Sequence, residues 1–245
     1  AGSTLVHGCG GAAALAGVIV LGAREGRFGR RGEKKSMQPF AASSIPLVTL
    51  GTFLLWFGWF GFNGFSQLAM GTFDDVNAIS KIAVNTHLAG AAGTFTGAAL
   101  TRLIGGKTDI VMMLNGALAG LVAITAEPLT PGPITAMLIG SVGAIIMYFG
   151  TKMLESYGLD DVVGAIPVHM FAGIFGTLVV PLTNPETSFG TQFIGTASVC
   201  IFSFALSWAT FTALKSTIGL RISKAAEKLG TDKAEVGVTA YSIRD

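Results

Sequence analysis

Long apolar runs alternate with short polar links along almost the whole chain. Seven of these runs reach the roughly 20 residues that a helix needs to cross the hydrocarbon core of a bilayer. They cover residues 1–22, 46–70, 79–104, 109–127, 132–150, 162–182 and 190–219. The sequence therefore predicts an all-α polytopic membrane protein with seven transmembrane helices, followed by a mixed-charge tail at 220–245.

The basic residues fall on one side of this arrangement. If the chain starts outside and the spans alternate, the links after the first, third, fifth and seventh spans face the cytoplasm. These links and the tail carry 15 of the 16 lysines and arginines, which leaves Lys81 outside. Positively charged loops stay on the cytoplasmic side, so we expect a cytoplasmic tail. The fifteen residues are Arg24, Arg27, Arg30, Arg31, Lys34, Lys35, Arg102, Lys107, Lys152, Lys215, Arg221, Lys224, Lys228, Lys233 and Arg244.

The composition agrees with a membrane location. Hydrophobic residues make up 51% of the chain and charged residues 12%, whereas soluble domains carry about 25% charged residues. Most of the 34 glycines lie inside the apolar runs, where small residues let helices approach closely. Cys9 and Cys200 lie in apolar segments too, and we expect them to pack as small hydrophobic residues.

Two of the three histidines occupy matching positions inside predicted spans. His7 begins HGCGG and His169 begins HMFAG, so a glycine follows each histidine four residues later. Residues four apart share a helix face, and the repetition suggests an internal duplication of the kind common in transporters. Two facing imidazoles can form a donor–acceptor line in a narrow pore, which suits a small polar solute or a proton relay. A packed structural histidine is the plainer alternative.

Aromatic residues crowd the outer half of the second predicted span, in LLWFGWFGFNGFSQLA at 54–69. Core packing and an interfacial aromatic belt are the simpler interpretation. Alternatively, one ring lies across a pore mouth, where aromatic faces attract cations, and Asn63 and Ser66 supply polar contacts beside it. At the start of the sixth span, Asp160 and Asp161 are placed to cap a helix N-terminus.

Several function classes find no support in the sequence. The chain contains no P-loop, no His/Cys metal spacing and no G-x-S-x-G, so we expect neither an enzyme nor a metal or cofactor site. The membrane orientation already accounts for the basic residues, which removes the case for nucleic-acid binding.

Four stretches of the sequence together resemble the ammonium transporter family (Amt/MEP/Rh), and its Amt branch in particular. They are AGSTLVHGCGG, GTFLLWFGWFGFNGFSQLA, NGALAGLVAITAEP and DDVVGAIPVHMFAGIFGTL, with a weaker match in the tail. The resemblance implies helices five to eleven of an eleven-helix inverted-repeat fold that forms homotrimers with one pore per subunit. We therefore expect a native gene product that is longer at its N-terminus, or a partial sequence.

The resemblance also implies roles for individual residues. His7 and His169 would be the twin histidines of the pore and its proton relay, Phe62 a ring of the outer gate, and Ser66 a contact of the recruited ion. Asp161 matches an acidic residue eight positions before the second histidine, and we expect Asn63 and Trp59 to support the gate.

The implied function is uptake of ammonium across the cell membrane. NH4+ would be recruited and deprotonated outside, NH3 would pass the pore, and the proton would travel separately. A PII-type regulator is an implied partner at the cytoplasmic tail. Two other functions stay open: an ammonium sensor that signals through its tail, and a haem b electron-transfer protein with His7 and His169 as ligands.

Three positions inside the predicted spans depart from the family pattern, and the tail reads AEVGVTAY rather than the common EHGESAY form. Phe65 and Met170 stand where the family commonly has glycine, which is expected to narrow or reshape the pore. His87, in NTHLAG, stands where the family usually has another residue, and we interpret it as structural.

Overall fold

The computed structural model describes residues 1–28 and 40–240, and within them it contains helices and turns without a β-strand. The predicted all-α class is therefore confirmed. Among the predicted cytoplasmic residues, Arg30, Arg31, Lys34, Lys35 and Arg244 lie outside the described residues, as do the last five positions of the predicted tail.

A helical segment lies within each of the seven predicted spans. The first span consists of a π-helical turn, η1 (Ser3–Gly8), which continues into α1 (Cys9–Leu21). The next four are α2 (Ile45–Phe65), α3 (Phe73–Gly105), α4 (Ile110–Ile124) and α5 (Pro133–Ser156). The sixth consists of the π-helical turn η2 (Ile166–Phe171), α6 (Ala172–Leu178) and the 3₁₀ turn η3 (Val180–Leu182), and the seventh is α7 (Phe189–Thr217). The tail contains α8 (Lys224–Leu229) and η4 (Asp232–Val236).

The described helices include four that are long and apolar enough to cross a membrane, namely Ser3–Leu21, α2, α5 and α7. The apolar helices Ile110–Ile124 and Ile166–Leu182 are shorter, and α3 has charged residues near both ends. These properties support the membrane-protein class, while the depth of each helix in a bilayer stays a prediction.

Polar side chains define where several helices begin. Ser44, Asp109 and Ser188 each accept a hydrogen bond from a backbone N–H three residues later, at the starts of α2, α4 and α7. At the start of α3, Thr72 and Asp75 satisfy each other's backbone N–H groups in a capping box. These side chains pair N–H groups that the first turn of a helix otherwise leaves free, so the short polar links end sharply at the helices.

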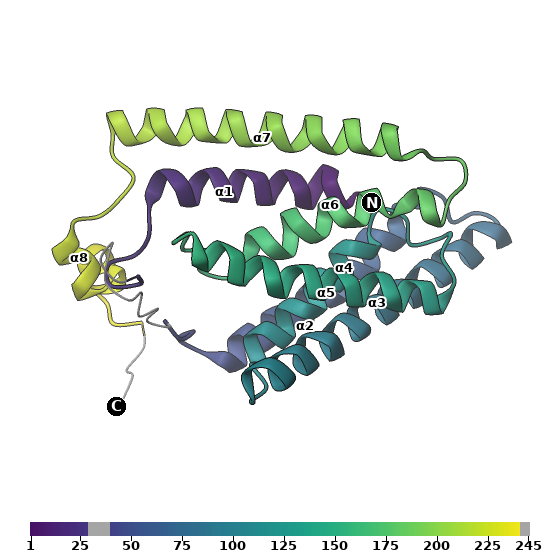
Figure 1. Ribbon diagram of the computed structural model, residues 1–245, viewed down its shortest axis with the longest axis horizontal. Helices are drawn as coiled ribbons and strands as arrows, with labels where there is room; N and C mark the ends of the chain where they lie inside the picture. Colours follow the sequence, from purple (N-terminus) through teal and green to yellow (C-terminus); the bar gives the residue numbers. More distant parts are fainter. Residues whose placement is uncertain (29–39, 241–245) are drawn as a thin grey trace.

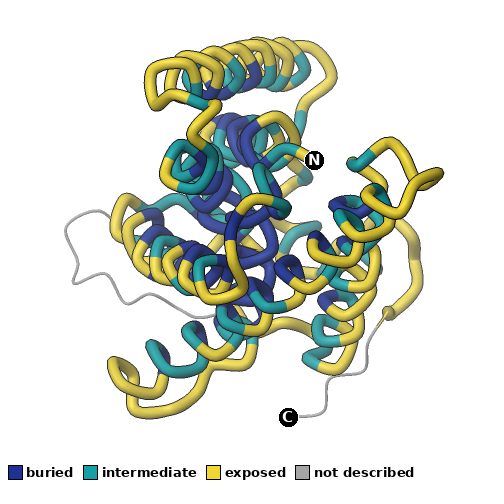
Figure 2. The backbone as a smooth tube through the Cα atoms, turned by 90° about the vertical axis from the view of Figure 1, so that its right-hand side faces the viewer, coloured by how far each residue is buried: buried dark blue, intermediate teal, exposed yellow. Residues whose placement is uncertain are grey.

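The helices form two groups that meet around α4 and α6. On one side α3, α4 and α5 pack closely with α2 beside them, and on the other α1 lies along α7, with α6 between the groups (Figure 1). Eleven of the fifteen α4 residues are buried, which makes α4 the centre of the bundle. Buried residues accordingly gather in the middle of the molecule (Figure 2). By contrast, α2 and α7 are largely exposed.

Glycines allow α3, α4 and α5 to touch through their backbones. A Cβ atom on Gly93 would overlap the carbonyl oxygen of Gly116, and one on Gly140 would overlap the carbonyl oxygen of Ala89. Such small-residue contacts are how apolar helices gain packing energy where lipid supplies no hydrophobic driving force between them.

The ends of α1, α5 and α7 meet at one end of the bundle. Lys215 and Arg221 donate to the carbonyl oxygens of Val20 and Leu21, and Arg27 pairs with Glu155 at 2.8 Å. These contacts agree with an alternating topology in which the basic links share one side. That this side is the cytoplasm stays a prediction.

We expect Gly93→Ala to lower the free energy of unfolding by about 1–3 kcal/mol, the usual cost of overpacking a tight contact. The matched control is Gly51→Ala on α2, because a Cβ there meets no atom within 4 Å. Thermal unfolding in detergent measures the stability of both variants. An equal effect of the two substitutions would show that the α3–α4 contact does not determine the loss of stability.

Candidate functional site

Each of the two paired histidines lies in a π-helical turn that continues as an α-helix. His7 lies in η1 before α1, and His169 lies in η2 before α6. π-Helical turns are rare and occur frequently at functional sites, because the extra residue redirects side chains and frees backbone groups. The two elements thus share a local design, in addition to the H-x-x-x-G spacing of the sequence.

The two histidine-bearing elements cross through reciprocal glycine contacts. A Cβ atom on Gly11 would lie 2.5 Å from the backbone nitrogen of Met170, the residue after His169. A Cβ atom on Gly173 would lie 2.6 Å from the carbonyl oxygen of Ser3 and 3.2 Å from the nitrogen of Gly8, the residue after His7. Each glycine therefore admits the backbone that carries the other histidine.

This crossing brings the two imidazole rings together. The Nδ1 atoms of His7 and His169 lie 3.2 Å apart, and the ring planes differ by 18° with centroids 5.2 Å apart. At this distance one ring donates an N–H and the other accepts it, so a single proton joins the pair. The Nε2 atom of His7 is buried and has no hydrogen-bond partner among the described residues.

Two aromatic rings of α2 enclose His7. Trp59 stacks on the imidazole with ring centroids 4.9 Å apart and planes 13° apart. The Phe62 ring lies nearly perpendicular to the imidazole, with centroids 5.8 Å apart and planes 87° apart. Of the predicted gate residues, Trp59 and Phe62 therefore lie directly against the histidine pair.

The two polar residues predicted beside the gate form hydrogen bonds to groups other than the histidines. Asn63 is 1% exposed, and its Nδ2 donates to Thr86 Oγ1 on α3 at 2.9 Å. Ser66 is exposed, and its hydroxyl donates to the carbonyl oxygen of Phe62 at 2.7 Å. Because these hydrogen bonds are made away from the histidines, the roles of both side chains at the gate stay predictions.

Asp161 holds the start of the turn that carries His169. Its two carboxylate oxygens accept the backbone N–H groups of Ala165 at 2.9 Å and Ile166 at 2.7 Å. The carboxylate thus caps the N-terminus of η2, as its position in the sequence suggested, and it fixes the turn whose fourth residue is His169.

Asp160 ties the same turn to the end of α1. Its side chain is 3% exposed and accepts hydrogen bonds from the backbone nitrogen, Nε and Nη2 of Arg24 at 2.7–2.9 Å, with Arg27 3.5 Å away. Burial alone would raise the pKa of Asp160, but the donors and charges of Arg24 and Arg27 outweigh it and hold that pKa below its ordinary value. The hydrogen bond to Asp160 in turn raises the pKa of Arg24.

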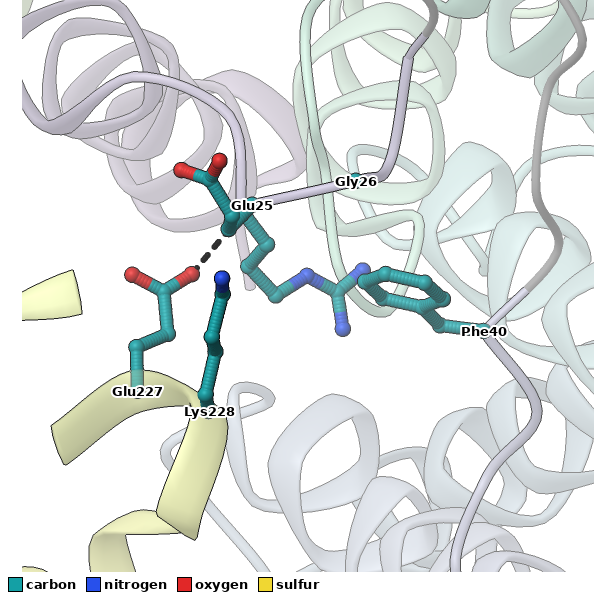
Figure 3. Close-up of a pocket in the computed structure, with 6 residues that line it drawn as sticks. Glu25, Gly26, Phe40, Glu227 and Lys228 are labelled. Carbon is teal, nitrogen blue, oxygen red and sulfur yellow. Dashed lines mark hydrogen bonds between the residues drawn. The ribbon is translucent and has the colours of Figure 1, made fainter. Parts of the chain in front are cut away.

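The tail lies against the link that follows α1. The backbone N–H of Glu25 donates to Glu227 of α8 at 2.8 Å (Figure 3), and Arg221 bridges Glu227 to the end of α1. A pocket of about 470 Å³ opens between these segments, lined by Arg24, Glu25, Gly26, Phe40, Glu227 and Lys228. None of the predicted site residues lines it.

Sequence reasoning missed the threonines around the histidine pair. Thr125 accepts the indole N–H of Trp59 at 2.7 Å. Within η1, Thr4 bonds to Thr177 of α6 at 2.6 Å and to Thr196 of α7 at 3.2 Å through their hydroxyl groups. Threonine is common in apolar helices, and each of these contacts joins distant segments, so the sequence offered no signal for them.

The fold and the histidine pair define a polytopic helical membrane protein in which two related elements cross at a buried site. The comparison with protein families agrees: the model of the Ammonium Transporter Family matches residues 1–241. The chain belongs to the ammonium transporter family.

Curated relatives and solved structures support this assignment. The ammonium transporter Amt2 of Archaeoglobus fulgidus is 39% identical over 98% of this chain and 54% of its own length. Amt1 of Haloferax mediterranei is 34% identical over 98% of this chain and 48% of its own length. The chain therefore spans about half the length of these relatives.

The similar solved structures have the same arrangement of helices. A protein described as a sensor Amt protein matches with a TM-score of 0.87 and 32% identity, over 96% of this chain and 59% of that one. Mep2 of Candida albicans matches with a TM-score of 0.79 and 28% identity, over 97% of this chain and 55% of that one.

We expect Asp160→Asn to lower the free energy of unfolding by about 2 kcal/mol at neutral pH, less than for a fully buried pair because Arg24 is 35% exposed. Folding lowers the pKa of Asp160, so its contribution is complete above the ordinary aspartate pKa of about 3.9. It disappears as the pH falls through the folded-state pKa. Thermal unfolding curves of wild type and variant should therefore converge on acidification.

The control for this substitution is Asp74→Asn, in the exposed first turn of α3. It should behave like the wild type at neutral pH. A stability difference for Asp160→Asn that persists once the pH has fallen below the folded-state pKa of Asp160, or an equal loss in the control, would contradict the role given to the ion pairs.

Proposed function

We propose that this protein carries ammonium across the cell membrane and that His7 and His169 form the conducting site. The observation that carries this proposal is the 3.2 Å contact between the two Nδ1 atoms, made by elements from separate spans. The identity of the substrate is inferred from the relatives, which are named ammonium transporters.

The aromatic surroundings of His7 favour deprotonation before passage. The imidazole of His7 has apolar aromatic neighbours in Trp59, which stacks on it, and Phe62, which lies nearly perpendicular to it. A bare ammonium ion loses far more hydration energy in such surroundings than neutral ammonia does. In this mechanism NH4+ gives up its proton on the outer side of Phe62, near Ser66, and NH3 continues past the histidines.

The histidine pair also provides a separate route for the proton. The shared Nδ1 contact leaves the Nε2 atom of each ring on the side away from its partner. A proton that binds to one Nε2 allows the proton between the rings to shift, and the second ring then releases a proton from its own Nε2. The balance is one proton in and one proton out, with both rings neutral again.

The same proposal includes the topology, the assembly and the regulatory partner of the transporter. The chain would correspond to helices five to eleven of the family fold, with the tail in the cytoplasm. The assembly would be a homotrimer in the cell membrane, and the tail would offer a docking site for a PII-type regulator. The position of α8 beside the end of α1 supports a tail that responds to the membrane domain.

A sensor is the second candidate function. The specific observation in its favour is the likeness to a protein described as a sensor Amt protein, at a TM-score of 0.87. A sensor would bind ammonium at the same histidines and pass the signal to the tail, so it would show binding without flux.

The haem alternative fits the geometry poorly. Two imidazole ligands on opposite sides of one iron need nitrogen atoms about 4 Å apart, given metal–nitrogen bonds of about 2.0 Å. The Nδ1 atoms are only 3.2 Å apart, which leaves no space for a metal between them.

The test is ammonium uptake by liposomes that contain the full-length gene product. We expect His7→Ala and His169→Ala each to reduce charge-coupled uptake by about 10²-fold, the usual contribution of a positioned proton-transfer group. Electrical current and pH change, recorded together, separate ammonium entry from ammonia entry.

The matched control is His87→Ala. His87 is exposed on α3 and contacts Trp56 and Phe60 rather than the histidine pair, so its loss should leave uptake unchanged. Wild-type currents in both pore variants would remove the histidines from the mechanism. Specific ammonium binding with no flux in the wild type would favour the sensor.

A further inference from the structure

The indole of Trp59 packs against the imidazole of His7. The indole is 5% exposed, and its face covers the His7 imidazole at 4.9 Å, while His169 meets the edge of that imidazole through Nδ1. A rotation of the indole would remove the support on one side of His7. The orientation of Trp59 therefore bears directly on the 3.2 Å contact between the histidines.

A single hydroxyl group fixes the indole. Trp59 Nε1 donates to Thr125 Oγ1 at 2.7 Å, and Thr125 Oγ1 donates to the carbonyl oxygen of Leu121 at 2.6 Å. Because the one hydroxyl proton is used on Leu121, a lone pair of the oxygen faces Trp59. Thr125 is fully buried, so water cannot easily replace this acceptor.

The same end of α4 also holds the turn that carries His7. The backbone N–H of Gly2 donates to the carbonyl oxygen of Thr125 at 3.3 Å. Ser3 Oγ donates to the carbonyl oxygen of Val122 at 2.6 Å. One helix end thus sets both the backbone of η1 and the ring that stacks on its histidine.

We propose that Thr125 is a positioning residue that orients His7 through Trp59. The hydroxyl of Thr125 bonds to the indole and to Leu121 rather than to a histidine, so it acts by holding the indole parallel to the imidazole. The proposal rests on the proposed transport function for its effect on uptake, while its effect on Trp59 can be measured independently.

Three substitutions separate positioning from simple stability. Thr125→Val keeps the shape but removes the acceptor, which leaves the indole N–H buried and unpaired. Thr125→Ser keeps the hydroxyl. Thr52→Val makes the same chemical change at another buried position of the bundle, on the helix that carries Trp59, where the hydroxyl bonds to its own helix at Val48.

The first measurement is spectroscopic and needs no transport. In a full-length protein with Trp56→Phe and Trp208→Phe, Trp59 is the one tryptophan left among residues 1–245. Any tryptophan that the gene encodes outside these residues is replaced as well. We expect Thr125→Val to shift the Raman band that reports hydrogen bonding of the indole N–H. Thr125→Ser and Thr52→Val should leave this band in place.

The second measurement is ammonium uptake in liposomes across a range of pH. We expect Thr125→Val to reduce uptake by about tenfold or more and to shift the pH profile, with Thr125→Ser within about twofold of the wild type, since small misplacements of a reacting group are costly. An unchanged Raman band, or wild-type uptake and pH profile in Thr125→Val, would overturn the proposal.

The two measurements distinguish the failure of this proposal from the failure of the transport function. If the unsubstituted protein carries no ammonium, the transport function fails, while the Raman band still tests the bond between Thr125 and Trp59. If Thr125→Val and Thr52→Val lose uptake equally with the band unchanged, the loss is general destabilisation and the positioning role is wrong.

Discussion

The close crossing of two glycine-faced turns is the constraint on which the rest of the site depends. Gly11 lies against the backbone beside His169, and Gly173 lies against the backbone beside His7. Any side chain at either glycine would push the two elements apart by more than a hydrogen bond tolerates, because N–H···N contacts weaken rapidly beyond about 3.2 Å. The pairing of the imidazoles is thus a property of two helices, and neither histidine could supply it alone.

A buried site also requires hydrogen-bond partners for the polar groups around it. Buried polar groups strengthen one another when they are paired and are costly when they are not. Here the indole N–H of Trp59 has Thr125, and the hydroxyl of Ser3 has the carbonyl oxygen of Val122. The buried Nε2 of His7 lacks a partner among the described residues. The site therefore combines a frame of paired polar groups with a buried imidazole nitrogen that is not part of that frame.

The sequence predicted the features that depend on local pattern. Apolar runs located the helices, and the H-x-x-x-G spacing, together with the family resemblance, indicated that His7 and His169 meet. It could not predict the π-helical turns, or the bonds from Trp59 to Thr125 and from Arg24 to Asp160, which join positions 66 and 136 residues apart. Such contacts depend on which helices cross and on which residues lie at the crossing. For the same reason, the sequence did not show that Asn63 bonds to Thr86 on α3.

The two histidine-bearing elements are held together by charged contacts at the end of the bundle and by glycine contacts in its middle. At the end where α1 stops, Asp160 binds Arg24, while the neighbouring Asp161 caps the turn that carries His169. Charged contacts are strong and directional, and at a helix end they avoid the cost of placing ions in hydrocarbon. In the middle, glycine contacts bring the backbones together without any charged side chain. Because the ion pair fixes the two elements along their length and the glycines fix their separation, the histidine rings are left with one mutual arrangement.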